Sequence, residues 1–282
     1  MAVSISVLGL GMMGRPMVRT LLEAGCDVRG WNRSALPPDL TEGIPLCRTI
    51  KESAGADVCL LMLLDSKAVD AVLEQVEPDL EAGQVVLDMS SSDPIRSTDH
   101  ARRLTAKGIG WIDAPVSGGP EGAADGTLAI MAGGAASDFE TVKPVLDILG
   151  GNVVHVGGPG MGHVVKVINQ VIVGLTIEAV AEGLTLAEKT GVDPRLVQQA
   201  LKGGFADSKI LQLHGSRMIR RSYVPGGKAT IQLKDLNLAR ALADSADLRL
   251  PHVESLITFY EKLISQKDGD LDHSAIHKLL WT

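Results

Sequence analysis

Several features that would indicate other classes of protein are missing from this sequence. Its three cysteines, Cys26, Cys47 and Cys59, show neither the spacing of a metal or redox motif nor the even number of a disulfide framework. The formal net charge of −7 lacks the basic excess that general binding to nucleic acids or anionic membranes needs. The remaining composition, 45% hydrophobic and 22% charged over 282 residues, is that of a soluble globular protein with two domains or one large one.

The sequence also lacks clear signals for export or membrane insertion. Its first residues carry no basic stretch before an apolar one, so we expect no signal peptide. The most apolar stretch is interrupted by Lys166, Glu178 and Glu182, which leave an uncharged run too short to span a bilayer. We therefore expect a cytoplasmic protein with no nucleic-acid or membrane partner.

A glycine-rich loop near the start of the chain predicts a dinucleotide site. Residues 3–8 are short, apolar and β-rich, and residues 15–24 have apolar positions at helical spacing. The glycines between them fit the G-x-G-x-x-G pattern, in which the first allows the tight turn, the second admits the pyrophosphate and the third packs helix on strand. Because glycines near a strand end often only make a turn, the strand before and the helix after carry the prediction. The predicted cofactor loop is Gly9, Leu10, Gly11, Met12, Met13 and Gly14.

The end of the next predicted strand, residues 27–31, indicates which dinucleotide binds. An NAD site would place Asp or Glu here to bind the ribose hydroxyls, but the chain continues Trp31-Asn32-Arg33-Ser34. Arg33 can pair with a 2′-phosphate, with Asn32 and Ser34 as hydrogen-bonding neighbours. The alternative is that Arg33 is an ordinary surface arginine. We expect NADP rather than NAD.

Further strands are predicted at residues 57–64, 85–89 and 111–114, with crossover helices between them. This alternation predicts an α/β fold with a doubly wound parallel sheet, in which ligands lie beyond the carboxyl ends of the strands. After a segment without a helix pattern at 121–126, residues 127–131 predict another strand. The binding edge then includes Leu63, Leu64, Ser90, Ser91, Ser92 and residues 115–119.

The loop that follows the strand at 111–114 offers a second binding element. Ser117, Gly118 and Gly119 supply a hydroxyl and unobstructed backbone N–H groups, which suit an anion such as a substrate carboxylate. The alternative is a tight turn without a binding role.

A long apolar stretch at residues 157–193 organises the rest of the chain. It opens with glycines, as a helix does where backbone must come close to other atoms, and continues as a nearly all-apolar helix. Lys166, Asn169 and Gln170 interrupt its first turns, and residues three and four apart share a helix face. A buried ammonium beside two carboxamides is costly unless it is paired, so either a structural partner or a chemical role must explain Lys166. If the role is chemical, the lowered pKa of a desolvated lysine allows it to exchange a proton near neutral pH.

The second half of the chain shows no strand pattern. Amphipathic helices are predicted at 194–203, 208–220, 232–246 and 253–265, with a loop at 222–227. His163 precedes Lys166 by one turn, but a histidine at a helix start is more often structural. The other histidines of this half, His252, His273 and His277, form no His-x₃-His pair with a carboxylate, so we predict no metal site.

These motifs together resemble the β-hydroxyacid dehydrogenase family, which includes 3-hydroxyisobutyrate dehydrogenases, tartronate semialdehyde reductases and glyoxylate/succinic semialdehyde reductases. The resemblance covers the full chain and is specific because six motifs occur in the same order. They are GLGMMGRPM (9–17), DMSSSDP (88–94), DAPVSGGPEGAADGTLAIMAGG (113–134), GMGHVVKVINQ (160–170), KDLNLA (234–239) and DGDLDHSAI (268–276).

The resemblance implies a fold and an activity. It implies a Rossmann-like NADP-binding domain at 1–161, a long interdomain helix at 162–193 and an all-α C-terminal domain at 194–282. It implies an NADP-dependent oxidoreductase that interconverts a small β-hydroxy or 2-hydroxy acid and its semialdehyde or oxo acid. Separately from the resemblance, we expect a homodimer or homotetramer.

It also implies roles for single residues. Lys166 becomes the general acid/base, assisted by Asn169, with Gln170 in reserve because family members place the amide at either position. Ser117, Gly118 and Gly119 match the substrate loop. Ser91 matches a contact to the nicotinamide ribose, and Lys234 matches a lysine over the cofactor.

Two positions depart from the family pattern. Many members have proline at the position of Leu64 and an aromatic residue at that of Gly227, so the nicotinamide pocket here is expected to be roomier. Glyoxylate and succinic, tartronic and methylmalonic semialdehydes stay open as substrates. Two other functions also stay open: a dinucleotide-binding sensor or scaffold without turnover, and an imine reductase. Imine reductases usually have another residue at the position of Lys166, so this lysine argues against the second.

Overall fold

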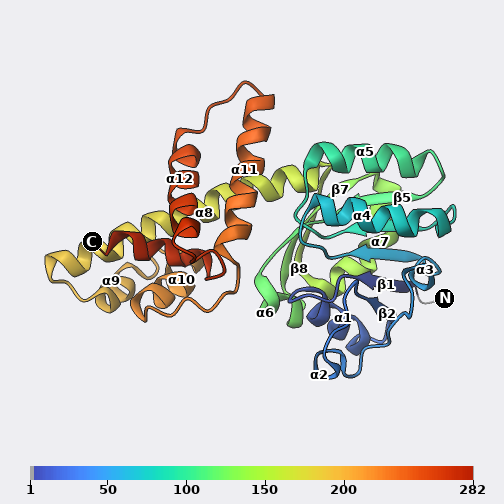
Figure 1. Cartoon of the computed structure of the whole chain (residues 1–282), viewed down its shortest axis with the longest axis horizontal. Helices are drawn as coiled ribbons and strands as arrows, with labels where there is room; N and C mark the ends of the chain where they lie inside the picture. Colours follow the sequence, from blue (N-terminus) through green and yellow to red (C-terminus); the bar gives the residue numbers. More distant parts are fainter. Residues whose placement is uncertain (1–2, 282) are drawn as a thin grey trace. The chain divides into compact units, whose positions relative to one another are not determined.

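The computed structural model describes residues 3–281 and divides into two compact units, Met1–Lys166 and Val167–Thr282 (Figure 1). The N-terminal unit contains the sheet, and the C-terminal unit is helical. The boundary between them falls within α8 (Met161–Thr190), a single helix of 30 residues.

Five strands of the N-terminal unit form the parallel part of its sheet, in the order β2-β1-β3-β4-β5. β3 and β4 are buried at every position, as expected of central strands with helices on both faces. The bounds are β1 (Ser4–Leu8), β2 (Asp27–Trp31), β3 (Val58–Leu61), β4 (Val85–Asp88) and β5 (Gly110–Asp113).

The far edge of the same sheet is mixed, which corrects the prediction of a wholly parallel sheet. β7 (Leu128–Gly134) runs antiparallel to β5 and to the short β6 (Val116–Ser117), and it pairs in parallel with β8 (Gly150–Gly157). The connection from β6 to β7 passes through Gly118 and Gly119, which both have positive φ, and through one short helix at Gly119–Ala124. β8 was not predicted, because its glycine and asparagine content hides the strand pattern.

Three of the described helices of this unit begin at side-chain caps. Asp65 accepts from the N–H of Ala68, and Asp93 accepts from that of Ile95. α6 forms where no helix was expected, since Pro120 lies in its first turn and needs no N–H partner there. The helices are α1 (Gly14–Glu23), α2 (Pro38–Thr41), α3 (Ile50–Ser53), α4 (Ser66–Val76), η1 (Glu77–Asp79), α5 (Pro94–Thr105), α6 (Gly119–Ala124) and α7 (Ala136–Leu149).

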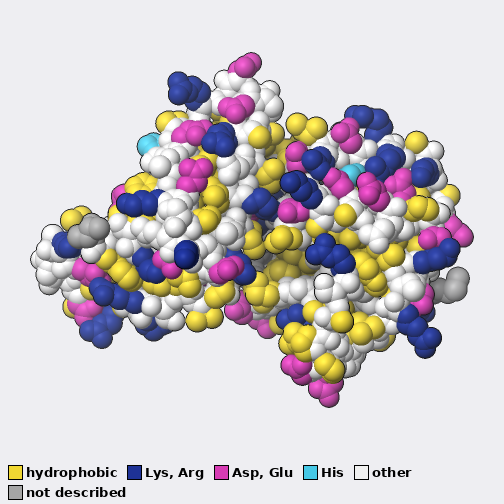
Figure 2. Space-filling model, in the orientation of Figure 1, with side chains coloured by type: hydrophobic (Ala, Val, Ile, Leu, Met, Phe, Trp, Pro, Cys, Tyr) yellow, Lys and Arg dark blue, Asp and Glu magenta, His cyan; other side chains and the backbone are white. Residues whose placement is uncertain are grey.

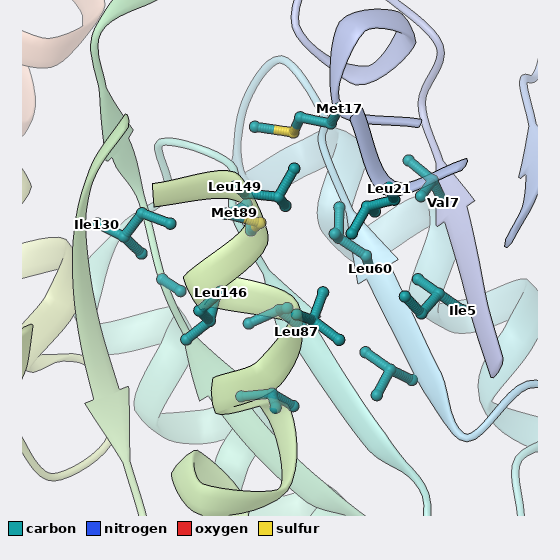
Figure 3. Close-up of a cluster of buried hydrophobic side chains, with 14 of the residues drawn as sticks. Ile5, Val7, Met17, Leu21, Leu60, Leu87, Met89, Ile130, Leu146 and Leu149 are labelled. Carbon is teal, nitrogen blue, oxygen red and sulfur yellow. The ribbon is translucent and has the colours of Figure 1, made fainter. Parts of the chain in front are cut away.

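The core of the N-terminal unit lies on both faces of the sheet. Successive strand residues point to opposite faces, so Leu60 packs in one apolar cluster and Leu61 in the other. Figure 3 shows the first cluster, where Met17 and Leu21 of α1 and Leu146 of α7 meet the strands. These buried side chains hold the helices against the sheet. Because β1 to β5 are parallel, their carboxyl ends lie at the same edge.

The C-terminal unit surrounds its own apolar core with helices. Asp193 and Ser208 cap α9 (Pro194–Leu201) and α10 (Lys209–Ile219). The helices α11 (Ala229–Ser245) and α12 (Pro251–Ser265) lie side by side (Figure 1), and η2 (His273–Leu280), a 3₁₀ helix, packs on both. Core residues shared by these elements include Leu236, Leu256, Tyr260 and Ile276.

The surface carries charges of both signs. On the face drawn in Figure 2, the Lys and Arg side chains are interspersed with Asp and Glu, with no broad area of one sign. By length and composition α8 could cross a membrane, and 22% of its most apolar window is buried. Lys166, Glu178 and Glu182 remain the charged interruptions noted in the sequence, and a core helix passes the same test.

Candidate active site

The loop between β1 and α1 leaves open space beside its middle glycine. Gly9 has φ +107°, and a Cβ there would lie 2.3 Å from the backbone oxygen of Met62. A Cβ on Gly14 would lie 1.9 Å from the oxygen of Gly9, whereas one on Gly11 would meet nothing within 4 Å. Packing therefore explains Gly9 and Gly14, while the space at Gly11 and the N-terminus of α1, which lacks a side-chain cap, fit a bound pyrophosphate.

Asn32 holds this loop to the end of β2. Its Oδ1 accepts from the N–H of Leu10 at 3.0 Å, and its Nδ2 donates to the carbonyl of Ser34 at 2.8 Å. Arg33 and Ser34 are exposed beside it. Among residues 3–281, Arg33 has no ion pair, so its guanidinium is available to a ligand. Leu10 is buried, Met13 is half-buried and Met12 is 44% exposed.

The loops after β3 and β4 are joined at Ser90. Its Oγ accepts from the N–H of Leu63 at 3.0 Å, and its own N–H donates to the Oδ1 of Asp88 at 3.0 Å. Leu64 is 64% exposed and Ser91 is half-buried. The parallel strands thus bring these predicted cofactor contacts to the same edge as the glycine loop.

The predicted substrate loop begins where β6 ends. Ser117 is half-buried and pairs with Ala129 of β7, and Gly118 and Gly119 have φ of +145° and +71°. The Oε2 of Glu121 lies 3.1 Å from the Cβ position of Gly119, so a carboxylate stands close to this loop.

Lys166 lies against this loop. Its Nζ donates to the carbonyl oxygen of Val116, the residue before Ser117, at 2.8 Å. Lys166 is half-buried. Lys166 and the substrate loop therefore meet within the N-terminal unit.

Two buried aspartates that sequence reasoning missed hold the start of α8. The Oδ1 of Asp113 accepts from the N–H of Gly160 at 2.7 Å, and its Oδ2 accepts from that of His163 at 3.0 Å. The ring of His163 lies between Asp113 and Asp88. Burial alone would lower the pKa of His163, but the close contact with Asp113 and the charges of Asp113 and Asp88 outweigh it and raise the pKa. The sequence signal that could have indicated these two residues is that an aspartate ends each of two apolar strands.

In the C-terminal unit, Gln170 is fixed by α11. Its Nε2 donates to Asp235 at 2.7 Å and to Gln232 at 3.3 Å, and Gln232 donates to the carbonyl of Gln170 at 3.0 Å. Asn169 donates to the Oε1 of Gln170 at 2.8 Å. Lys234 is 3.1 Å from Asp235. These contacts bring together three predicted site residues, Asn169, Gln170 and Lys234.

His214, Asp272 and His273 have the residue types of a metal site, with ligand atoms within 4.8 Å of one another. Asp272 already accepts from Ser274, from Gly226 and from Arg217, whose cation lies 2.5 Å away. Burial would raise the pKa of Asp272, but hydrogen bonds from His214, Ser274 and Gly226 and the charge of His273 hold it far below its usual range. With these donors, Asp272 joins several segments of the C-terminal unit through its side chain. The absence of a metal stays a prediction.

Comparison with known proteins identifies the family. Residues 4–157 match the NAD binding domain of 6-phosphogluconate dehydrogenase, and residues 160–280 match the model described as NAD-binding of NADP-dependent 3-hydroxyisobutyrate dehydrogenase. The 2-hydroxy-3-oxopropionate reductase of Escherichia coli (strain K12) is 40% identical, over 98% of this chain and 96% of that protein. The chloroplastic glyoxylate/succinic semialdehyde reductase 2 of Arabidopsis thaliana is 31% identical, over 99% of this chain and 79% of that protein.

Structural comparison agrees. The 3-hydroxyisobutyrate dehydrogenase of Mycobacterium tuberculosis, solved with L-serine, matches with a TM-score of 0.88 and 29% identity over 100% of both chains. The Rossmann-like sheet followed by a helical C-terminal domain is therefore confirmed. The chain belongs to the β-hydroxyacid dehydrogenase family, and it is an NAD(P)-dependent oxidoreductase of the 3-hydroxyisobutyrate dehydrogenase type that acts on a CH–OH group.

Proposed function

We propose that this enzyme uses NADP to interconvert a small β-hydroxy or 2-hydroxy acid and its semialdehyde or oxo acid, with Lys166 as general acid/base. The contact between the Nζ of Lys166 and the carbonyl of Val116 carries this proposal. It holds the amine of Lys166 beside the loop formed by Ser117, Gly118 and Gly119.

The chain's residues supply placement and a proton. When NADPH is bound, its nicotinamide supplies the hydride. In the reducing direction the Lys166 ammonium donates a proton to the oxygen as negative charge develops on it, and in oxidation the neutral amine removes the hydroxyl proton. The Ser117 hydroxyl and the backbone N–H groups of Gly118 and Gly119 hold the substrate carboxylate and thereby orient the carbonyl.

NADP is preferred in this proposal because of the charges at the end of β2. The segment 31–34 contains no carboxylate to bind ribose hydroxyls, and Arg33 is exposed next to the glycine loop. The family model that matches residues 160–280 is named for an NADP-dependent enzyme, which supports the same choice.

The amide that assists Lys166 is proposed to be Asn169. Gln170 makes two side-chain bonds to α11 in addition to the one from Asn169, so its amide is tied down. Asn169 precedes it by one residue on α8 and donates only to Gln170 among the hydrogen bonds given above. Gln170 then orients Asn169, and Lys234 of the same cluster is proposed to contact the cofactor.

The substrate is proposed to be a small carboxylate-bearing aldehyde or oxo acid. The E. coli relative is named for 2-hydroxy-3-oxopropionate, and the M. tuberculosis relative was solved with L-serine, which also carries a carboxylate. The expectation of a roomier pocket at Leu64 and Gly227 stays a prediction.

A panel of substrates tests this function directly. Glyoxylate and tartronic, succinic and methylmalonic semialdehydes are offered with NADPH, and the loss of nicotinamide absorbance is followed. We expect tartronic semialdehyde, which is 2-hydroxy-3-oxopropionate, to be reduced most efficiently. Binding of NADPH without reduction of any member of the panel would instead favour a non-catalytic dinucleotide-binding protein.

We also propose that the enzyme is a homo-oligomer, a homodimer or homotetramer, formed through α8. Ile168, Ile172 and Leu186 are 51%, 60% and 66% exposed and lie on one side of that helix. Gly183, with nothing within 4 Å of its Cβ position, leaves room for the same helix of a second copy. Light scattering should give a multimeric mass that Ile172→Glu lowers, and a monomeric wild type would refute this proposal.

A further inference from the structure

The start of α8 is attached to the sheet through groups that the proposed mechanism does not use. A Cβ on Gly162 would lie 2.3 Å from the carbonyl oxygen of Met131 and 2.4 Å from that of Asp113, so the helix backbone touches the sheet directly. The side chain of Asp113 accepts from the N–H groups of Gly160 and His163, which places a carboxylate at the N-terminus of the helix.

His163 completes this attachment, and both of its ring nitrogens face acceptors. Nε2 lies 3.1 Å from the carbonyl oxygen of Ser90 and 3.6 Å from the Oδ2 of Asp88. Nδ1 lies 3.4 Å from the Oδ2 of Asp113, as an ion pair rather than an aligned hydrogen bond. A neutral imidazole would turn a lone pair toward one of these oxygens, whereas an imidazolium presents an N–H to each.

Burial makes the charge state of this cluster costly to change. The side chains of His163 and Asp113 are fully buried and that of Asp88 is 1% exposed. Two carboxylates without a cation between them would repel each other in a region that water does not reach. His100 of α5 also faces Asp88, but it pairs with Asp70 at 2.9 Å. The remaining nearby charge on α8 is Lys166, whose ammonium is at the carbonyl of Val116.

We propose that His163 is a positioning residue, held as an imidazolium between Asp88 and Asp113, which fixes the first turn of α8 and thereby the place of Lys166. The same ring binds the carbonyl of Ser90, whose Oγ accepts from Leu63 and which precedes Ser91. His163 thus ties the proposed acid/base to the loops proposed to contact the cofactor.

Nitrogen NMR of the whole enzyme, with ¹⁵N-labelled histidine, tests the charge state without any activity measurement. The His163 resonances, assigned by their loss in His163→Gln, should show two protonated ring nitrogens at pH 7. His277 is the internal comparison, because burial lowers its pKa and its Nδ1 lies 3.0 Å from the hydroxyl of Tyr223. A neutral His163 ring at pH 7 would overturn the proposal.

A pair of variants tests whether the charge matters beyond packing. His163→Gln leaves two buried carboxylates without a cation between them, so the urea midpoint of this variant should fall. The double variant His163→Gln/Asp88→Asn has one carboxylate fewer and should recover part of that loss. The amide introduced by Asp88→Asn keeps an oxygen for the N–H of Ser90, and the Asp113 cap is untouched. The loss of urea midpoint in the double variant is compared with the losses in His163→Gln and Asp88→Asn alone. If the two single losses sum to that of the double variant, the charge of His163 does not matter and the proposal is wrong.

Kinetics tests the positioning role, and this part rests on the proposed function of Lys166. His163→Gln should lower kcat by about 10- to 100-fold through misplacement of Lys166, with the KM for NADPH within about twofold. The double variant should recover part of the lost kcat. Unchanged kcat in His163→Gln would refute positioning. Full turnover in Lys166→Met would instead refute the proposed function, while the NMR and stability results would still stand.

Discussion

The Nζ of Lys166 and the carbonyl oxygen of Val116 are 2.8 Å apart, although 50 residues separate them in the chain. This hydrogen bond joins the first turns of α8 to the strand that leads into Ser117. A lysine in the first turns of an apolar helix thus has a polar neighbour directly before the loop that is predicted to bind an anion. The contact makes the role of Lys166 the first to test.

Replacing Lys166 by Met should remove the proton donor while keeping the apolar stem. We expect kcat to fall by about 10²–10⁴, with little change in NADPH affinity, because the glycine loop is untouched. Steady-state rates and NADPH fluorescence titration measure the two quantities. Lys189→Met, at the exposed end of the same helix, is the matched control and should retain full activity. Full turnover in Lys166→Met would exclude the assigned role.

Replacing Arg33 by Ala should weaken NADPH binding by about 1.5–3 kcal/mol, the usual range for a hydrogen bond to a charged group. NADH lacks the 2′-phosphate, so its affinity should not change. Titrations with both cofactors give the difference, and Arg29→Ala, an exposed arginine on β2, controls for net charge. Equal affinities of the wild type for NADPH and NADH would contradict the preference.

Gly9 and Gly11 should respond differently to alanine. Gly9→Ala places a Cβ 2.3 Å from the backbone of Met62 at a positive φ, so it should destabilise the N-terminal unit by more than about 1 kcal/mol. Gly11→Ala meets no atom and should leave stability nearly unchanged while reducing NADPH affinity. Urea denaturation and titration separate the two effects. Undiminished affinity in Gly11→Ala would show that the pyrophosphate does not bind there.

Asp272 should make the C-terminal unit sensitive to acid. Its pKa is held below the unfolded value of about 3.9, so its stabilisation is present above that pH and is lost as the pH falls toward the folded pKa. Asp272→Asn should cost about 3–5 kcal/mol at pH 7, because it leaves Arg217 without its buried partner. The difference from wild type should shrink below pH 4 in urea denaturation, and a constant difference would contradict this account.

Strong local patterns predicted the elements that position the site. The strand at 27–31 and the helices after Asp193 and Ser208 were found close to their observed bounds, because apolar periodicity and caps act over a few residues. The antiparallel pairing of β6 with β7 was not predicted, since apolar periodicity gives the position of a strand and not its direction relative to its neighbours.

The candidate site divides in the same way. Gly9, Arg33 and Lys166 were predicted as site residues from local features: glycine spacing, the end of a strand without a carboxylate, and a lysine in an apolar helix. Asp88 and Asp113 begin two of the motifs, but the sequence does not show that both face His163.

Amino-acid order alone was enough to establish the two-part fold, the dinucleotide loop and the family, because these depend on periodicity, glycine spacing and motif order. Folding decided which polar groups share a buried environment. His163 lies between carboxylates 50 and 75 residues away, and Gln170 binds Asp235 across 65 residues. A buried charge needs a partner of opposite charge or a hydrogen bond, and the folded chain can supply that partner from any position in the sequence.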